Sequence, residues 1–291
     1  MPSPRVHASL LGLTVGDAFG ETFFRPGGDG MPQVLARALA PAPWRWTDDT
    51  AMALGVVEVL REHGRADPDR LATVFARDHA RDPYRGYGAG AREILLWIER
   101  GMPWRWAAGQ AFGGQGSMGN GAAMRAAPIG AWFGGDLDRV KVEALASAAP
   151  THAHPDGAAG AVAVAVAAAV AGEGGSPDAV WEAVLELTPD GETRAGLARA
   201  RALPADASVR LAAAALGTGW RVLSSDTVPF AIWCATRDLD DYEEALWRTV
   251  EGLGDRDTTC AIVGGIVGAR VGVDGIPPAW RDATEAWPAI G

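Results

Sequence analysis

The sequence predicts an all-α protein that folds as a single compact domain over residues 1–291. Most segments repeat apolar residues at the three- and four-residue spacing of a helix, and few alternate polar and apolar residues as a half-buried strand does. The linkers between them are short or rich in Gly, Pro and Asp, and no long low-complexity stretch divides the chain. An apolar content of 48% is ample for one large core.

Thr47 is a good N-cap residue and is expected to begin a helix. Asp48 and Asp49 would then lie in the first turn, near the positive end of the helix dipole. The longest apolar run, residues 157–172, falls short of the roughly 20 residues that a membrane span needs, so we expect a core helix with closely packed neighbours. In chain order, the expected helices cover residues 51–62, 68–80, 91–99, 140–149, 158–171, 179–187, 210–216, 242–250 and 259–270.

Charge and cysteine content narrow the class of protein. The net charge of -10 predicts no general affinity for nucleic acid or for anionic membranes, so any phosphate must be held locally.

Cys234 and Cys260 lie in apolar surroundings, where buried reduced thiols are expected and a pairing is the alternative. The apolar run near the amino end is broken by Asp17 and is too short for a secretory signal, which favours a cytoplasmic protein. Lys141, the single lysine among 26 basic residues, indicates a GC-rich bacterial genome.

Two acidic clusters open predicted helices near opposite ends of the chain. Aspartate at the start of one helix usually serves as a cap, but two such helices present hard oxygen ligands from two directions. Bringing four carboxylates together in a core requires divalent cations, and oxygen donors suit Mg²⁺ or Mn²⁺. Zinc does not fit, because the His and Cys residues lack its ligand spacing. The clusters are Thr47, Asp48 and Asp49, and then Asp255, Asp257 and Thr258.

Two glycine-rich loops lie between the acidic clusters. Residues 85–90, RGYGAG, run directly into a predicted helix, so their backbone N–H groups can point at an anion at its N-terminus. Residues 113–121 contain five glycines and precede a helical stretch that Pro128 is expected to kink or end. Each loop alone is equally compatible with a plain turn. The two together indicate a diphosphate held beside metal ions.

The histidines give weaker signals. His152, in the loop THAHP, opens the helix of alanine and valine and is either a ligand contact or an ordinary loop residue. His79 is expected at the surface.

Taken in order, these motifs resemble those of the ADP-ribosylglycohydrolase family. The matching segments span nearly the whole chain, and the ordered set is far more specific than any one of them. The resemblance implies an orthogonal all-α fold around two Mg²⁺ ions, with Mn²⁺ as the alternative, that cleaves the glycosidic bond between ADP-ribose and an acceptor. The segments are LLGLTVGDAFG at 10–20, WTDDTAMAL at 46–54, RGYGAG at 85–90, GQGSMGNGAAMRAAPIG at 114–130, THAHP at 151–155 and GDRDTTCAIVGGIVGA at 254–269.

The resemblance also implies roles for individual residues. The two acidic clusters would bind the metal ions from opposite sides, and Asp49, Asp257 or Glu21 would transfer protons. The glycine loops would hold the diphosphate and ribose of ADP-ribose or of an ADP-ribosylated substrate. The implied substrate-binding residues are Gly86, Tyr87, Gly88, Gly119, Asn120, Gly121, Met124 and His152.

The sequence departs from the family at two positions. Arg256 replaces a small residue between two of the implied metal ligands, so its cation either tunes the metals or faces away. Phe24 stands eight residues after Gly16, where the family commonly has an acidic residue. Glu21 is a nearby carboxylate, out of register with that position.

Two other functions fit the same residues. Clustered aspartates with Mg²⁺ also serve the two-metal cleavage of phosphate esters and anhydrides. A non-catalytic ADP-ribose-binding protein is the second alternative, suggested by Phe24 and Arg256. The presence of all four aspartates favours an enzyme over the binding protein.

Overall fold

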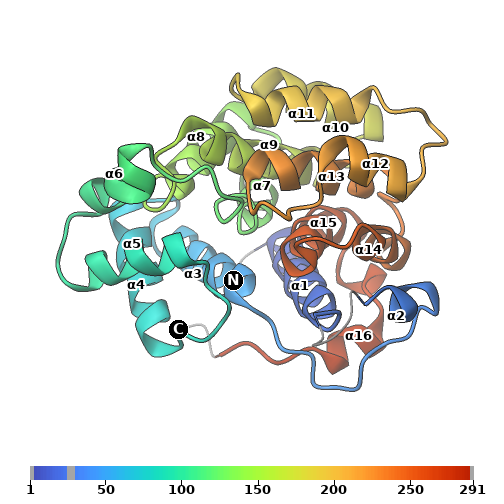
Figure 1. Cartoon of the computed structure of the whole chain (residues 1–291), viewed down its shortest axis with the longest axis horizontal. Helices are drawn as coiled ribbons and strands as arrows, with labels where there is room; N and C mark the ends of the chain where they lie inside the picture. The colour runs from blue at the N-terminus through green and yellow to red at the C-terminus, as the bar shows by residue number, and fades with distance from the viewer. Residues whose placement is uncertain (1–2, 25–29, 289–291) are drawn as a thin grey trace.

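Helices supply the regular structure of this protein. The computed structural model describes residues 3–24 and 30–288, and in these ranges it contains no β-strand, only isolated bridges that join Trp44 to Thr284 and Gly119 to Leu223. The all-α fold class is therefore confirmed. The helices, shown in Figure 1, are α1 (Pro4–Glu21), α2 (Met31–Leu35), α3 (Asp48–His63), α4 (Pro68–Arg81), α5 (Ala89–Glu99), α6 (Trp104–Gly114), α7 (Ala127–Phe133), α8 (Leu137–Ala148), α9 (Pro155–Gly172), α10 (Pro177–Leu187), α11 (Glu192–Arg201), α12 (Val209–Leu216), α13 (Ser224–Arg237), α14 (Tyr242–Glu251), α15 (Arg256–Val271) and α16 (Pro278–Ala283), with a 3₁₀ turn at Val273–Gly275.

Two helices from opposite ends of the chain, α1 and α15, pack directly on each other at backbone distance (Figure 1). Gly12, Gly16 and Gly20 recur every four residues along α1 and so share one face. A Cβ atom at Gly16 would lie only 2.2 Å from the carbonyl oxygen of Cys260 on α15. Glycine is required for this approach, which places the end of α1 against the start of α15.

Helix α9 forms the centre of the other half of the core, where α7, α8, α10 and α15 pack around it. A Cβ atom at Gly130 of α7 would lie 1.9 Å from the carbonyl oxygen of Ala165 in α9, so these two helices also touch through their backbones. Among the described helices, α9 is the one long and apolar enough to cross a membrane, but 72% of it is buried inside the protein. The expectation of a core helix is confirmed.

Every helix expected from the sequence is present, with boundaries that differ by at most a few residues. The structure adds helices that the pattern did not predict, among them α1, α7, α11 and α13. Pro128 occupies one of the first positions of α7 and begins that helix instead of kinking or ending one. Proline is well suited to that place, because the first N–H groups of a helix have no intrahelical acceptor.

The predicted surface position of His79 is wrong. Its ring is buried, its Nδ1 lies 2.7 Å from a carboxylate oxygen of Glu99, and the ring packs edge-on against Tyr87. A histidine followed by alanine and arginine near a helix end looks exposed, but the partner acid comes from the next helix. Cys234 and Cys260 are both buried free thiols, as expected.

Candidate metal centre and nucleotide site

Thr47 begins the first acidic cluster by capping α3. Its Oγ1 accepts a hydrogen bond from the backbone N–H of Asp49 at 3.4 Å and lies 3.0 Å from Asp49 Oδ2. Asp48 and Asp49 occupy the first turn of α3 and are 9% and 1% exposed. Carboxylates at this end of a helix are favoured by its dipole, but such burial is costly for a charged group.

Asp17, on α1, holds the start of this cluster through hydrogen bonds. It was not among the predicted site residues. It accepts hydrogen bonds from the backbone N–H groups of Thr47 and Thr50, at 2.9 and 3.0 Å. The hydroxyl groups of the same two threonines lie 2.8 and 2.6 Å from its oxygens. Burial raises the pKa of Asp17 to about 6, although these hydrogen bonds act in the opposite direction. The signal for Asp17 was present in the GDA motif of the family resemblance.

The second acidic cluster opens α15. Asp255 is the N-cap residue, and its Oδ2 accepts a hydrogen bond from Asn120 Nδ2 at 2.6 Å. Asp257 follows in the first turn, and its Oδ1 accepts the backbone N–H of Thr258 at 2.9 Å. Burial raises the pKa of Asp257 well above its usual range, and the charges of Asp255 and Asp17 raise it further.

The fold places the two clusters close enough for their charges to interact. Burial raises the pKa of Asp49 well above its usual range, and the charges of Asp17, Asp257, Asp48 and Asp255 raise it further. Burial and then the charge of Asp17 raise the pKa of Asp48 to about 8. These carboxyl groups, separated by some 200 positions in sequence, therefore repel one another in one buried region.

The donor set fits a hard divalent cation. Asp49 Oδ1 is buried and has no hydrogen-bond partner within the described part of the chain. A buried carboxylate oxygen without a proton donor is expected where a cation binds. The charges of the two clusters interact. Within residues 3–24 and 30–288, however, no three His, Cys, Asp or Glu side chains lie close enough together to form a compact metal-ligand group.

The first glycine loop passes beside the first acidic cluster. Gly86 has φ +94°, and a Cβ atom there would lie 3.2 Å from Asp48 Oδ1. Tyr87 is buried, and burial, followed by the charge of Asp48, raises its pKa above the usual range. Gly88 is the N-cap residue of α5, so the loop opens a helix N-terminus as predicted.

The second glycine loop begins where α6 loses regular geometry. Phe112 and Gly113 have positive φ values, and the exposed ring of Phe112 lies against Gly90 of the first loop, 2.7 Å from where a Cβ atom would be. The loop continues to the turn at Gly119 and Gly121. The two loops thus meet.

Asn120, within this turn, bonds the second acidic cluster. Besides its contact with Asp255, its Nδ2 donates to Thr227 Oγ1 at 3.1 Å. Met124 is buried next to the turn, with its sulfur 3.9 Å from the Cβ position of Gly121. Asn120 therefore orients Asp255, a contact that the predicted substrate role did not include.

His152 lies behind the same turn. Its Nε2 is 3.5 Å from the Cβ positions of both Gly119 and Gly121, and its Nδ1 lies 2.7 Å from Thr151 Oγ1. Burial, with the nearby charge of Arg125, lowers the pKa of His152 to about 3. The ring is therefore neutral at physiological pH and supports the turn by contact instead of by charge.

The comparison with protein families agrees with this geometry: the family model described as ADP-ribosylglycohydrolase matches residues 2–290. The chain belongs to the ADP-ribosylglycohydrolase family. Its similar relatives include the ADP-ribosylhydrolase ARH3 of Homo sapiens, 30% identical over 97% of this chain and 90% of that protein. The ADP-ribosylarginine hydrolase Tri1 of Pseudomonas putida is 25% identical over 97% of this chain and 74% of the relative. A solved structure titled ADP-ribosylglycohydrolase-related protein complex has the same fold, with a TM-score of 0.71 at 24% identity over 97% of this chain and 92% of that one.

The two departures from the family motifs pack against each other. The guanidinium carbon of Arg256 lies 4.3 Å from the centre of the Phe24 ring, and Nη1 donates to the carbonyl oxygen of Phe23 at 2.9 Å. The cation therefore extends to the end of α1. Burial and then the charge of Asp17 raise the pKa of Glu21 to about 6, and the charge of Arg256 acts in the opposite direction.

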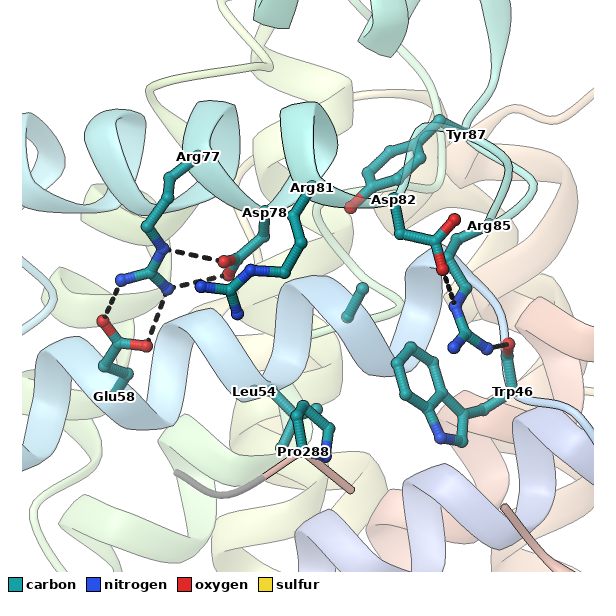
Figure 2. A pocket seen from close by; sticks show the side chains of 11 residues that line it. Trp46, Leu54, Glu58, Arg77, Asp78, Arg81, Asp82, Arg85, Tyr87 and Pro288 are labelled. Atoms are coloured by element: carbon teal, nitrogen blue, oxygen red, sulfur yellow. Dashed lines mark hydrogen bonds and ion pairs between the residues drawn. The ribbon is translucent and has the colours of Figure 1, made fainter. Parts of the chain in front are cut away.

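A small cavity adjoins the first acidic cluster, and one predicted substrate-binding residue lines it. It has a volume of about 110 Å³ and lies beside α3 and α4, next to Trp46 and Tyr87 (Figure 2). The described residues that line it include none of the six predicted metal ligands. Glu58 and Arg77 form a bidentate ion pair at its far end, at 2.7 and 2.8 Å.

Proposed function

We propose that this member of the ADP-ribosylglycohydrolase family is a metal-dependent hydrolase that cleaves the glycosidic bond between ADP-ribose and an acceptor. The observation that carries the proposal is the meeting of two buried aspartate clusters, one with an unpartnered carboxylate oxygen, beside two glycine loops. The names of the relatives, an ADP-ribosylhydrolase and an ADP-ribosylarginine hydrolase, support the same reaction.

Six residues would hold two Mg²⁺ ions, or Mn²⁺ in their place. Bound ions would neutralise the carboxylates and supply Lewis-acid activation of a water molecule. Without cations the same carboxyl groups hold protons at raised pKa values, so the site is prepared for positive charge. The residues are Thr47, Asp48, Asp49, Asp255, Asp257 and Thr258.

The glycine loops would bind the diphosphate and the ribose. Gly86 and Gly88 present the start of α5 to an anion next to Asp48. The exposed ring of Phe112, between the loops, offers a surface on which an adenine can stack. The nucleotide would then lie across both loops with its ribose at the aspartates.

Proton transfer is assigned to Glu21, Asp49 or Asp257. A general acid or base works best with a pKa near the working pH, and the pKa of Glu21 is raised to about 6. Glu21 ends α1, four residues after Asp17, and is half-buried. It is the group best suited by pKa to move a proton between the acceptor and water.

The test is to replace Asp49 or Asp257 by asparagine. We expect either change to reduce the release of ADP-ribose at least ~100-fold, because one metal ligand is lost, while circular dichroism and thermal unfolding show a folded protein. Asp190→Asn, at a side chain that is 91% exposed on a distant surface, is the matched control and should retain full activity. Near-normal turnover in Asp49→Asn or Asp257→Asn would contradict the proposal.

A panel of ADP-ribosylated arginine, serine and nucleic-acid substrates, assayed with Mg²⁺, with Mn²⁺ and with chelator, identifies the acceptor and the metal. Glycosidic cleavage releases ADP-ribose, whereas cleavage of the anhydride releases AMP. Tight ADP-ribose binding by calorimetry without turnover of any substrate would instead identify a binding protein.

A further inference from the structure

The segment after α16, residues 284–287, crosses the residues that precede the first acidic cluster. Thr284 makes a parallel β-bridge with Trp44. The Trp44 N–H donates to the carbonyl oxygen of Ala283 at 2.7 Å, and the Glu285 N–H donates to the carbonyl oxygen of Trp44 at 2.8 Å. We call residues 284–287 the C-terminal strap. It lies alongside the residues that precede Thr47.

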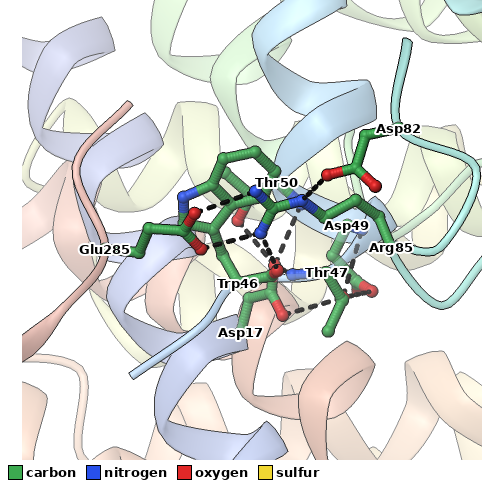
Figure 3. Close-up of polar contacts among 8 residues, drawn as sticks. All are labelled: Asp17, Trp46, Thr47, Asp49, Thr50, Asp82, Arg85 and Glu285. Atoms are coloured by element: carbon green, nitrogen blue, oxygen red, sulfur yellow. Dashed lines mark hydrogen bonds and ion pairs between the residues drawn. The ribbon is translucent and has the colours of Figure 1, made fainter. Parts of the chain in front are cut away.

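Arg85 connects the strap to residues 44–49, as Figure 3 shows. We call residues 44–49 the metal-ligand loop, because they end in the proposed ligands Thr47, Asp48 and Asp49. Arg85 Nη1 and Nη2 donate to the two carboxylate oxygens of Glu285, at 2.7 and 2.8 Å. Nη1 also donates to the carbonyl oxygen of Trp46 at 3.0 Å, and the guanidinium lies 3.6 Å from the centre of the Trp46 ring. Nε donates to Asp82 at 2.8 Å, and the Arg85 side chain is only 11% exposed. All three nitrogen atoms of the guanidinium therefore donate hydrogen bonds.

The carbonyl group of Trp46 and the N–H group of Thr47 belong to one planar peptide unit. Arg85 donates to its oxygen, and Asp17 accepts from its nitrogen at 2.9 Å. This unit is therefore held at both ends by charged side chains from different parts of the chain. Its orientation sets the direction of the Thr47 side chain and of the first turn of α3 that follows.

The strap is anchored independently on α1. Trp287 Nε1 donates to Thr14 Oγ1 at 2.9 Å, and its ring packs edge-on against His7. Thr14 lies three residues before Asp17 on the same helix. The strap and Asp17 thus share one rigid support, and the metal-ligand loop lies between them.

We propose that Glu285 acts as a positioning residue for the metal ligands Thr47, Asp48 and Asp49, through Arg85 and the Trp46 peptide unit. Glu285 touches neither substrate nor the reacting atoms. It keeps the guanidinium directed at the Trp46 carbonyl, because a bidentate carboxylate fixes the plane of arginine where water does not. We call the contacts of Arg85 with Glu285 and with the Trp46 carbonyl the clasp. The catalytic consequence of this inference rests on the proposed metal-dependent function, but the clasp itself does not.

The test uses Glu285→Gln, which keeps the size of the side chain and removes its charge, and Arg85→Lys, which keeps the cation and removes the fork. The matched control is Glu58→Gln, since Glu58 and Arg77 form a bidentate pair of the same lengths that does not contact residues 44–50. Two measurements are made on the full chain: hydrogen exchange of the Thr47 and Thr50 amides, and Mn²⁺ affinity by calorimetry.

We expect Glu285→Gln and Arg85→Lys to speed exchange at these two amides and to raise the Mn²⁺ dissociation constant about tenfold, as loss of an outer-sphere contact does. Glu58→Gln should change neither quantity, and amides of α9 should be unaffected in all three variants. A normal exchange rate and affinity in Glu285→Gln would overturn the inference, as would equal effects in Glu58→Gln.

The two proposals fail separately. If the unmodified protein binds no Mn²⁺ and releases no ADP-ribose, yet Glu285→Gln still speeds exchange at Thr47 and Thr50, the clasp is supported and the metal-dependent function is refuted. If the unmodified protein is an active metal enzyme and both measurements in Glu285→Gln are normal, the function stands and the clasp is refuted.

Discussion

Asp17 shows how much of this site depends on a residue that acts on the start of α3 through hydrogen bonds. It is fully buried, and its two oxygens receive the amides and hydroxyls of Thr47 and Thr50. A carboxylate that accepts so many donors holds the start of α3 in one orientation. Its charge also acts on Asp48, Asp49, Asp257 and Glu21, so it is part of the electrostatics of the site.

Asp17→Asn is expected to weaken metal binding more than it destabilises the fold. The amide has one oxygen, so its NH₂ group must face some of the N–H and O–H donors that the second carboxylate oxygen now accepts. We expect the Mn²⁺ dissociation constant to rise by about 10- to 100-fold and kcat/KM for ADP-ribose release to fall with it. Calorimetry and steady-state kinetics measure the two effects. An unchanged affinity would show that Thr47 and Thr50 do not need Asp17 to orient α3.

At the scale of elements, the pairing of α1 with α15 decides where the site is built. The glycines of α1 allow the carbonyl groups of α15 to approach, and this aligns Asp17 near the end of one helix with Asp257 at the start of the other. A Cβ atom at Gly12 would lie 2.3 Å from the carbonyl oxygen of Gly264, and one at Gly20 would lie 2.3 Å from that of Arg256. The contact is backbone against backbone along its length.

Gly16→Ala is therefore expected to destabilise the protein by about 1–3 kcal/mol, the usual cost of an added methyl in a fully packed core. The reason is that the Cβ would meet Cys260 backbone that cannot move without moving α15. The measurement is the free energy of unfolding in urea. Gly109→Ala, in α6 where the added Cβ has open space, is the control and should be neutral or slightly stabilising. Equal stability of both variants would contradict this account.

The helices that the sequence predicts and those that it misses differ in their surroundings. Helix α4 has one apolar face, with Leu71 and Phe75 buried and Arg70 and Arg77 outside, and its spacing is plain. Helix α1 is buried on nearly every side from Ser9 onward, so no polar face marks its period, and its glycines obscure it further. Buried helices of small residues are recognised by what packs on them, which a single sequence does not display.

The same contrast holds for the site. The aspartate clusters were predictable because acids at the starts of apolar helices stand out, and the glycine loops because five glycines in nine residues are rare in regular structure. The contact between Asn120 and Asp255 and the clasp of Arg85 with Glu285 were not predictable. Each joins segments more than 130 positions apart through side chains that are common on any surface.

For the molecule as a whole, the crowded carboxyl groups make the stability of the fold depend on pH. Asp17 and Asp48 have pKa values raised to about 6 and about 8, above the usual 3.8. Because the folded state binds these protons more tightly than the unfolded state, the stabilisation is complete below about pH 4 and is lost as pH rises through these two values. At neutral pH the metal-free site therefore weakens the fold.

We expect the unfolding temperature of the chelator-treated protein to fall between about pH 5 and about pH 8. Added Mg²⁺ should raise it more at the higher pH, because the ligands must be deprotonated to bind. Differential scanning fluorimetry at several pH values measures both effects. The Asp49→Asn protein, with one raised carboxyl fewer, should show the smaller dependence on pH. A metal-induced shift of equal size at both pH values would contradict this linkage.

The crossing of α1 with α15 also has a consequence for synthesis. Because α1 is synthesised first and α15 near the end of the chain, the glycine face of α1 cannot be buried against α15 until most of the protein has been made. A chain that ends before residue 256 would lack α15 and Asp257, so α1 would have no partner for its glycine face.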